Sequence, residues 1–193
     1  MKKSKLNQGG FTLFASLILL VLLTILGIAM LSGFTQDQLM AGNVREKARA
    51  LDSAQALLSS AQSWMAVPGN TYVGGGGWIT GQDCSSLSPI TVSNTSVNQV
   101  ICSNAISNPT ALPWTGFSMA STPTGMTVSA AGGVNTYAGN PSYHIQYIGT
   151  TTSNPPTAIY KVTAAGIGGN GDAVAVVQAV YEVKATSIDI SGS

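Results

Sequence analysis

The chain has 193 residues, which is enough for one modest domain with an appendage. Charged residues make up only 8% of the sequence, against roughly 25% in ordinary soluble domains, and residues 84–160 contain no Asp, Glu, Lys or Arg. The formal net charge is +1, and three of the eight basic residues are Lys2, Lys3 and Lys5. A nucleic-acid binder, which needs clustered Lys and Arg, is therefore excluded. The 45% of hydrophobic residues likewise excludes disorder driven by charge.

An uncharged apolar helix is the first predicted element. No Asp, Glu, Lys or Arg lies between Lys5 and Asp37, and residues 11–31 are mainly Leu, Ile, Val, Phe, Met and Ala. At about 1.5 Å per residue this segment reaches about 30 Å, the thickness of the hydrocarbon core of a bilayer. Basic residues precede it, so the positive-inside rule keeps the start of the chain in the cytoplasm and sends the rest outward. A cleaved secretory signal is the alternative, but its apolar region spans only about 7 to 15 residues.

The start of this helix carries a specific motif, Gln8-Gly9-Gly10-Phe11-Thr12-Leu13, directly after the short basic leader. The motif resembles the type IV prepilin signal, in which a membrane peptidase cuts after the Gly and then methylates the new amine. The resemblance implies that prepilin peptidase cuts between Gly10 and Phe11. Residues 1–10 would then be a leader that is removed, and residues 11–34 would form the transmembrane and assembly half of the helix.

Ala15 departs from the usual pilin pattern. In most pilins the fifth residue after the cut is Glu, which is thought to pair with the terminal amine of a neighbouring subunit during assembly. A carboxylate inside a bilayer is costly and is kept mainly where a partner compensates for it. The resemblance therefore implies a subunit at the very tip, where no subunit lies above it. The alternative is that Ala15 reflects sequence drift in a membrane anchor that is never assembled into a pilus.

The helix continues beyond the apolar segment as an amphipathic half, residues 35–68. We expect one helix from about residue 11 to about residue 66, ended by Pro68-Gly69. One face is expected to be apolar at spacings of three and four, with Leu51, Ala54, Leu58, Ala61 and Met65 on it.

The string Gln38-Leu39-Met40-Ala41-Gly42-Asn43-Val44-Arg45 opens this half. It resembles the amino-terminal family of PilX minor pilins, whose members carry a similar Met-Ala-Gly-Asn-(apolar)-Arg block just outside the membrane. Without the resemblance, the same block and the charges that follow it could equally be a solvated charge cluster on a helix.

Residues 69–193 are predicted to form one β-rich domain, because clusters of Gly, Asn and Pro separate short apolar runs. The clearest strands are residues 143–148, 158–164 and 173–183, joined by short loops into an antiparallel meander on the amphipathic half of the helix. The third strand begins with an uninterrupted apolar run, residues 173–177, and is expected to be central. The last two strands also resemble the final hairpin of PilX-type proteins. The predicted fold class is therefore α+β and pilin-like.

Cys84 and Cys102 are expected to form a disulfide, since an exported chain passes through an oxidising periplasm. A metal site is not expected, because no His or second pair of Cys lies near them in sequence. His144, the only histidine, lies in a predicted strand and is interpreted as a structural or surface residue rather than as a general base. We therefore predict no catalytic residue, no metal and no cofactor.

The leading hypothesis is a minor pilin that primes type IV pilus assembly and sits at or near the pilus tip. The resemblance implies as partners other minor pilins, the major pilin, a PilY-type tip adhesin and prepilin peptidase. It places the chain in the bacterial inner membrane, with a periplasmic carboxyl terminus, before assembly. One alternative is the tip minor pseudopilin of a type II secretion system, although a larger inserted domain is typical there. Another is a membrane-anchored periplasmic enzyme or binding protein.

Overall fold

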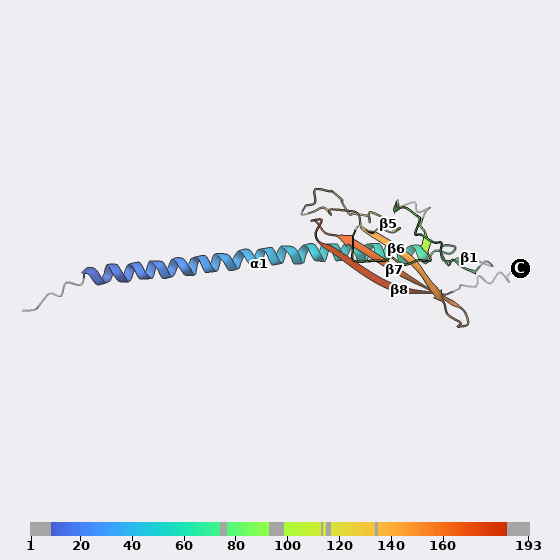
Figure 1. Cartoon of the computed structure of the whole chain (residues 1–193), viewed down its shortest axis with the longest axis horizontal. Helices are drawn as coiled ribbons and strands as arrows, with labels where there is room; N and C mark the ends of the chain where they lie inside the picture. Colours follow the sequence, from blue (N-terminus) through green and yellow to red (C-terminus); the bar gives the residue numbers. More distant parts are fainter. Residues whose placement is uncertain are drawn as a thin grey trace, which may run out of the picture. The chain divides into compact units, whose positions relative to one another are not determined.

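A computed structural model describes residues 9–73, 77–92, 99–112, 114, 117–133 and 135–184. In these described residues one helix, α1, is followed by eight strands, arranged as in Figure 1. The chain divides into two compact units, Met1–Val44 and Arg45–Ser193, and α1 contributes residues to both.

Helix α1 (Gly9–Met65) confirms the predicted continuous helix, and its start lies two residues earlier than expected. Its last carbonyl groups, which have no partner within the helix, are capped by the chain that follows. Asn70 Nδ2 donates to Trp64 O over 2.7 Å, and Thr71 Oγ1 donates to Met65 O over 3.2 Å. Gly69, with a φ of +94°, turns the chain away after Pro68, as expected for a glycine just beyond a helix end.

The strands form two sheets. A two-stranded hairpin pairs β1 (Tyr72–Val73) with β2 (Gly77–Trp78). The six-stranded sheet has the order β3-β5-β6-β7-β8, and β4 pairs with β6 off this path. Its long strands are β6 (Ser142–Thr150), β7 (Thr157–Ile167) and β8 (Val174–Lys184), and its two-residue strands are β3 (Ile90–Thr91), β4 (Ile101–Cys102) and β5 (Met119–Ala120). The sheet is mostly antiparallel, but the pairs β3–β5 and β4–β6 are parallel.

The predicted meander of three strands is confirmed, since β6, β7 and β8 pair antiparallel in sequence order. The expectation that the third strand is central is wrong: β7 lies between β6 and β8, and β8 ends the strand order. Alternate residues of β8, such as Ala175, face α1, whereas Val180 on the opposite face is 63% exposed. The run of valines reflects the preference of branched side chains for strands, and it does not require burial on both faces.

The core lies between α1 and the sheet. The buried stripe of the helix is Ala50, Ala54, Leu57, Ala61 and Met65. It packs on side chains of β6 and β7 that are almost completely buried, namely Tyr143, Ile145, Tyr160, Val162 and Ala164. These side chains, together with Met119 and the disulfide, form one contiguous apolar cluster.

The expected helix face is wrong at Leu51, which is 42% exposed, and only partly right at Leu58, which is half-buried. The physical reason is the close approach of the helix to Gly166 in β7. A Cβ atom at Gly166 would lie 2.2 Å from Ala50 O and 2.6 Å from Ala54 N. Small alanines at the contact permit this approach, so Ala50 takes the buried position that the pattern had suggested for Leu51.

Tyr160 links the hairpin to the sheet. Its hydroxyl group lies 3.1 Å from Thr71 O and 3.0 Å from Ile79 O, both of which can accept its hydrogen bond. Burial, reinforced by the neighbouring Tyr147, raises the pKa of Tyr160 to about 12. The hydroxyl is therefore neutral at physiological pH and acts as a hydrogen-bond donor in the core.

Candidate functional site

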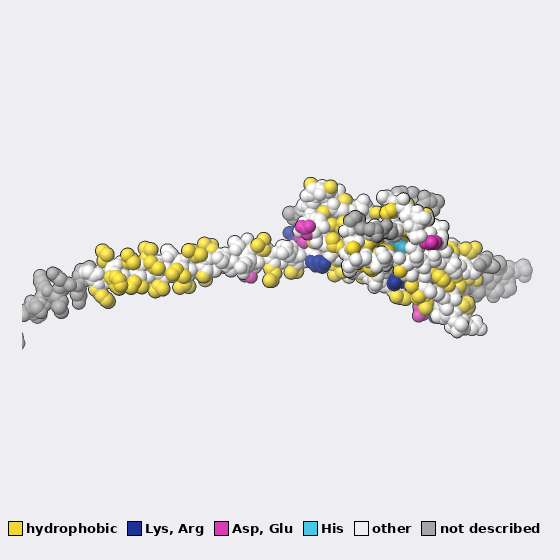
Figure 2. All heavy atoms as spheres, viewed as in Figure 1, with side chains coloured by type: hydrophobic (Ala, Val, Ile, Leu, Met, Phe, Trp, Pro, Cys, Tyr) yellow, Lys and Arg dark blue, Asp and Glu magenta, His cyan; other side chains and the backbone are white. Residues whose placement is uncertain are grey.

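The first candidate site is the apolar segment of α1. By length and composition, α1 is the one helix in the described part of the chain that could cross a membrane. Its large apolar side chains are exposed along residues 11–34, with Phe11 at 76%. Figure 2 shows hydrophobic atoms along the whole length of this segment. A surface of this kind needs a lipid or protein environment, because its exposure to water is unfavourable.

Three polar side chains of this segment donate hydrogen bonds to the backbone of the helix itself. Ser16 Oγ donates to Leu13 O over 2.9 Å, Thr24 Oγ1 donates to Val21 O over 2.7 Å, and Ser32 Oγ donates to Ile28 O over 3.1 Å. An unsatisfied hydroxyl group in an apolar medium costs several kcal/mol, so these bonds suit the segment to a bilayer or a filament core.

The residues predicted for processing and assembly lie together at the start of α1. Gly10, Phe11 and Ala15 fall in its first two turns, and all three are exposed. The rest of the predicted leader, residues 1–8, lies outside the described residues. Cys84 and Cys102 belong to the other compact unit.

A second cluster ties α1 to two turns of the β-rich unit. Arg49 Nη1 lies 3.1 Å from Glu46 Oε1 and donates to Gly133 O over 3.0 Å. Its Nη2 donates to Thr136 O, and the guanidinium carbon lies 4.9 Å from the centre of the Tyr137 ring. This geometry combines charged hydrogen bonds with a cation–π contact. We call Glu46, Lys47 and Arg49, with the turn residues that they contact, the helix clasp.

Glu46 completes the helix clasp by accepting a hydrogen bond from Gly169 N–H. Partial burial opposes ionisation of its carboxyl group. The Gly169 N–H and the Arg49 guanidinium outweigh this effect and hold the pKa of Glu46 below its usual value. Lys47 Nζ donates to Val174 O at the start of β8. Glu46, Lys47 and Arg49 thus make contacts within the subunit, and the alternative of a merely solvated cluster is wrong for these three residues.

The turn beside the helix clasp requires glycines. A Cβ atom at Gly168 would lie 2.6 Å from Glu46 O, and one at Gly169 would lie 2.6 Å from Gly133 O. The same turn, residues 168–172, carries a single carboxylate, that of Asp172. Among the described residues, no group of three or more His, Cys, Asp or Glu could hold a metal ion.

A disulfide and a histidine organise the charge-free region, residues 84–160. Cys84 and Cys102 form a disulfide, and Cys84 N donates to Asn104 Oδ1 over 2.8 Å. The ring of His144 is almost completely buried. Its Nδ1 lies 2.9 Å from Phe117 O and its Nε2 lies 2.9 Å from Asn104 O. His144 therefore has the structural role that was predicted, although its two contacts could not be foreseen.

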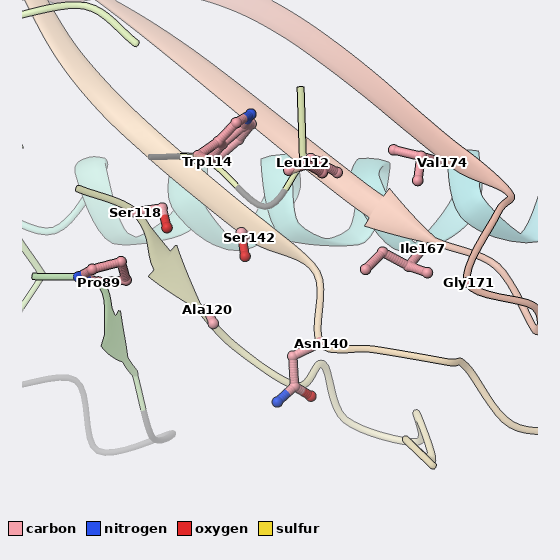
Figure 3. Close-up of a pocket in the computed structure, with 11 residues that line it drawn as sticks. Pro89, Leu112, Trp114, Ser118, Ala120, Asn140, Ser142, Ile167, Gly171 and Val174 are labelled. Carbon is pink, nitrogen blue, oxygen red and sulfur yellow. The ribbon is translucent and has the colours of Figure 1, made fainter. Parts of the chain in front are cut away.

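The face of the sheet opposite α1 carries an uncharged hollow of about 360 Å³ (Figure 3). Trp114 and Leu112 lie over β6 and β7 at its edge. The Trp114 indole N–H donates to Pro109 O over 2.8 Å. The rest of the lining is Pro89, Ser118, Ala120, Asn140, Ser142, Ala165, Ile167, Gly171 and Val174. Among the described residues no charged side chain lines it, so it could accept an apolar or neutral polar group.

Sequence reasoning missed the residues that hold the helix against the sheet. Gly166 and the partners of Glu46 and Arg49 were not identified. A signal for Gly166 was present, because a glycine inside an apolar strand often marks close approach of another backbone. No signal of comparable strength predicts the partners of Arg49, which lie more than eighty positions further along the chain.

Together, the long helix with an apolar first part and the β-rich unit on its second part define a pilin-like α+β protein. The family model "PilX N-terminal" matches residues 9–58, and the model "Type IV pilus assembly protein PilX C-term" matches residues 87–183. The chain belongs to the PilX family of type IV pilus assembly proteins. It is thus assigned a minor pilin role in pilus assembly, in a structural pilin family rather than an enzyme family. No curated protein and no solved structure shows a significant match to it.

Proposed function

We propose that this protein primes type IV pilus assembly in the inner membrane and then sits at or near the pilus tip. The observation that carries the proposal is Ala15 in an otherwise pilin-like apolar helix. A subunit without the usual carboxylate has no group to pair with the amine of the subunit above it. At the tip no subunit lies above, so a subunit there does not need this carboxylate.

The proposed route begins with processing. Prepilin peptidase removes residues 1–10 between Gly10 and Phe11 and methylates the new terminus. Residues 11–34 remain in the membrane as an anchor, and the rest of the chain lies in the periplasm. Transfer of the segment into the filament core exchanges one apolar environment for another, because lipid tails and pilin helices are similarly apolar.

The position of the protein in the fibre is tested by labelling. With an epitope tag on the carboxyl terminus, gold label is expected at one end of isolated pili. The Ala15→Glu variant is expected to be incorporated in the same amount and position, with Ala15→Ser as the uncharged control. Label along the shaft contradicts the proposal, as does an increase in incorporation for Ala15→Glu alone.

The proposed partners at the tip are other minor pilins and a PilY-type adhesin. The charge-free region, residues 84–160, is the proposed adhesin contact, and its uncharged hollow supports this choice because an apolar contact there removes no charge from water. A photocrosslinker at the exposed Asn140, which lines the hollow, is expected to capture the adhesin in cells. The control site is Gln178, exposed on β8. Capture at Gln178 and not at Asn140 would refute the assignment.

The family match favours this proposal over a secretion-system pseudopilin or an anchored periplasmic enzyme or binding protein. Gene context distinguishes the minor pilin from the pseudopilin, since the gene of a pilus protein is expected beside other pilus genes. Loss of piliation on deletion of the gene distinguishes the minor pilin from an anchored periplasmic enzyme or binding protein.

A further inference from the structure

His144 is the only histidine in the chain, and only 3% of it is exposed. Both of its ring nitrogens lie 2.9 Å from backbone carbonyl oxygens, at Phe117 and Asn104. Carbonyl oxygens only accept hydrogen bonds. A neutral imidazole has one N–H and one lone pair, so it can donate to one of these oxygens while its lone pair repels the other. An imidazolium ring donates to both.

We propose that His144 is a proton-dependent clamp that holds two segments of the charge-free region against β6. With two ring protons it fixes the segment at Asn104 and the segment at Phe117 together. With one ring proton it releases one of them. Histidine is the side chain whose unperturbed charge change lies between pH 5 and 8, and this general range sets the two pH values at which the clamp is tested.

The surroundings of the ring are neutral over the two clamped segments, since residues 84–160 contain no charged side chain. Across the sheet, His144 is in register with Thr163 of β7, whose Oγ1 accepts a hydrogen bond from Gln178 of β8. The cation on the adjacent strand is Lys161, in register with Gln146 on the same face as His144. The tyrosines of β6, Tyr143 and Tyr147, lie on the opposite face of the sheet.

An acid and the disulfide lie at the start of the first clamped segment in the sequence. Asp83 precedes Cys84, and its carboxylate accepts a hydrogen bond from Ser85 N–H over 2.9 Å. Cys84 and Cys102 are joined in the disulfide and do not titrate. Strands β4 and β5, which also pair with β6, bring no other titratable side chain. No acid on the clamped segments is therefore available to replace the carbonyl groups as the partner of the ring.

The ring has a route to solvent. A hollow of about 230 Å³ lies beside it, lined by Ser85, Asn104, Ala105, Ile106, Ser107 and Phe117 as well as by His144. Protons can therefore exchange at the ring without unfolding of the sheet. The clamp itself does not depend on the proposed function. An effect of the clamp on adhesin binding would depend on it, because the proposed adhesin contact lies in the same region.

The test is hydrogen exchange measured by mass spectrometry on the purified full chain in detergent micelles, at pH 5.5 and pH 8.0. Rates are corrected for the intrinsic pH dependence of exchange. Peptides covering residues 99–112 and 117–120 are expected to be on the order of tenfold better protected at pH 5.5, the size of effect of one charged hydrogen bond. His144→Gln, which cannot titrate, is expected to lose this difference. Gln146→Ala on the same strand is expected to keep it.

A second measurement does not depend on a variant. With a single histidine, labelling with ¹⁵N-histidine gives only two imidazole nitrogen signals, and both ring N–H protons are expected to exchange slowly enough to be observed at pH 5.5. Equal protection of the wild type at the two pH values would overturn the clamp. So would an undiminished pH effect in His144→Gln, or ring protons in fast exchange with water. These experiments need neither pili nor adhesin, so their failure is distinct from failure of the proposed function.

Discussion

Replacing Gly166 with alanine should force α1 away from the sheet. Gly166 lies in β7, the middle strand of the meander, and its backbone conformation is one that alanine adopts without strain. The added Cβ would lie 2.0 Å from Ser53 Oγ, 2.2 Å from Ala50 O and 2.6 Å from Ala54 N. Ser53 can rotate, but the other two atoms belong to the helix backbone and cannot move alone.

The magnitude follows from these distances. An ordinary Cβ contact begins at 3.4 Å, so the helix must retreat from 2.2 Å by 1.2 Å at Ala50 O. Overpacking of a core typically costs 1 to 3 kcal/mol. Because the clash is with backbone at a tightly packed contact, we expect Gly166→Ala to lower the free energy of unfolding by about 3 kcal/mol.

The assay is urea denaturation of the full chain in detergent micelles, followed by tryptophan fluorescence. All three tryptophans, Trp64, Trp78 and Trp114, lie in the unit Arg45–Ser193, so the signal reports on that unit. With an m-value of about 2 kcal/mol per molar urea, the midpoint should fall by about 1.5 M. Gly149→Ala in β6, where nothing lies within 4 Å of the added Cβ, is the control and should change stability by less than about 1 kcal/mol. Equal stability of Gly166→Ala and the wild type would refute the reasoning.

Three further predictions concern the helix clasp and the disulfide. Arg49→Ala should lower the free energy of unfolding by about 2 to 3 kcal/mol in the same assay, because it leaves two carbonyl groups without their donor; a change below about 0.5 kcal/mol would contradict this. The pKa of Glu46 is lower in the folded than in the unfolded chain, so its contribution is present above pH 4.5 and is lost as the pH falls through the folded pKa. Glu46→Gln should therefore show a smaller loss of stability below pH 4.5, and an acid profile identical to that of the wild type would count against the contact. Reduction of the Cys84–Cys102 disulfide, which closes a loop with a sequence separation of 18, should cost about 3 kcal/mol while the far-ultraviolet circular dichroism of α1 persists. Loss of that helical signal would show that the loop supports more than its own region.

Local features of the sequence were sufficient to predict much of the fold. The apolar segment, the helix end near Pro68 and the three long strands all follow from patterns within a few residues of each other. The prepilin motif at Gly10 and Phe11 is equally local. The helix and the three long strands agree with the structure to within about three residues at each end, whereas processing at Gly10 and Phe11 stays a prediction.

What could not be predicted depends on partners distant in the chain. Whether Ala50 or Leu51 faces the sheet is decided by Gly166, which lies more than a hundred positions away. The central place of β7 depends on β6 pairing with it on one side and β8 on the other, and a run of valines does not encode that order. The contacts of His144 depend on where the disulfide and the following loop place two backbone carbonyl groups.

The amino terminus of the mature protein tests the central claim most directly. Protein purified from pilus-bearing cells can be analysed by intact mass and by amino-terminal sequencing. The pilin route predicts a chain that has lost residues 1–10 and begins with a methylated Phe11. A mature chain that still begins at Met1, or one cut at another position, would contradict it.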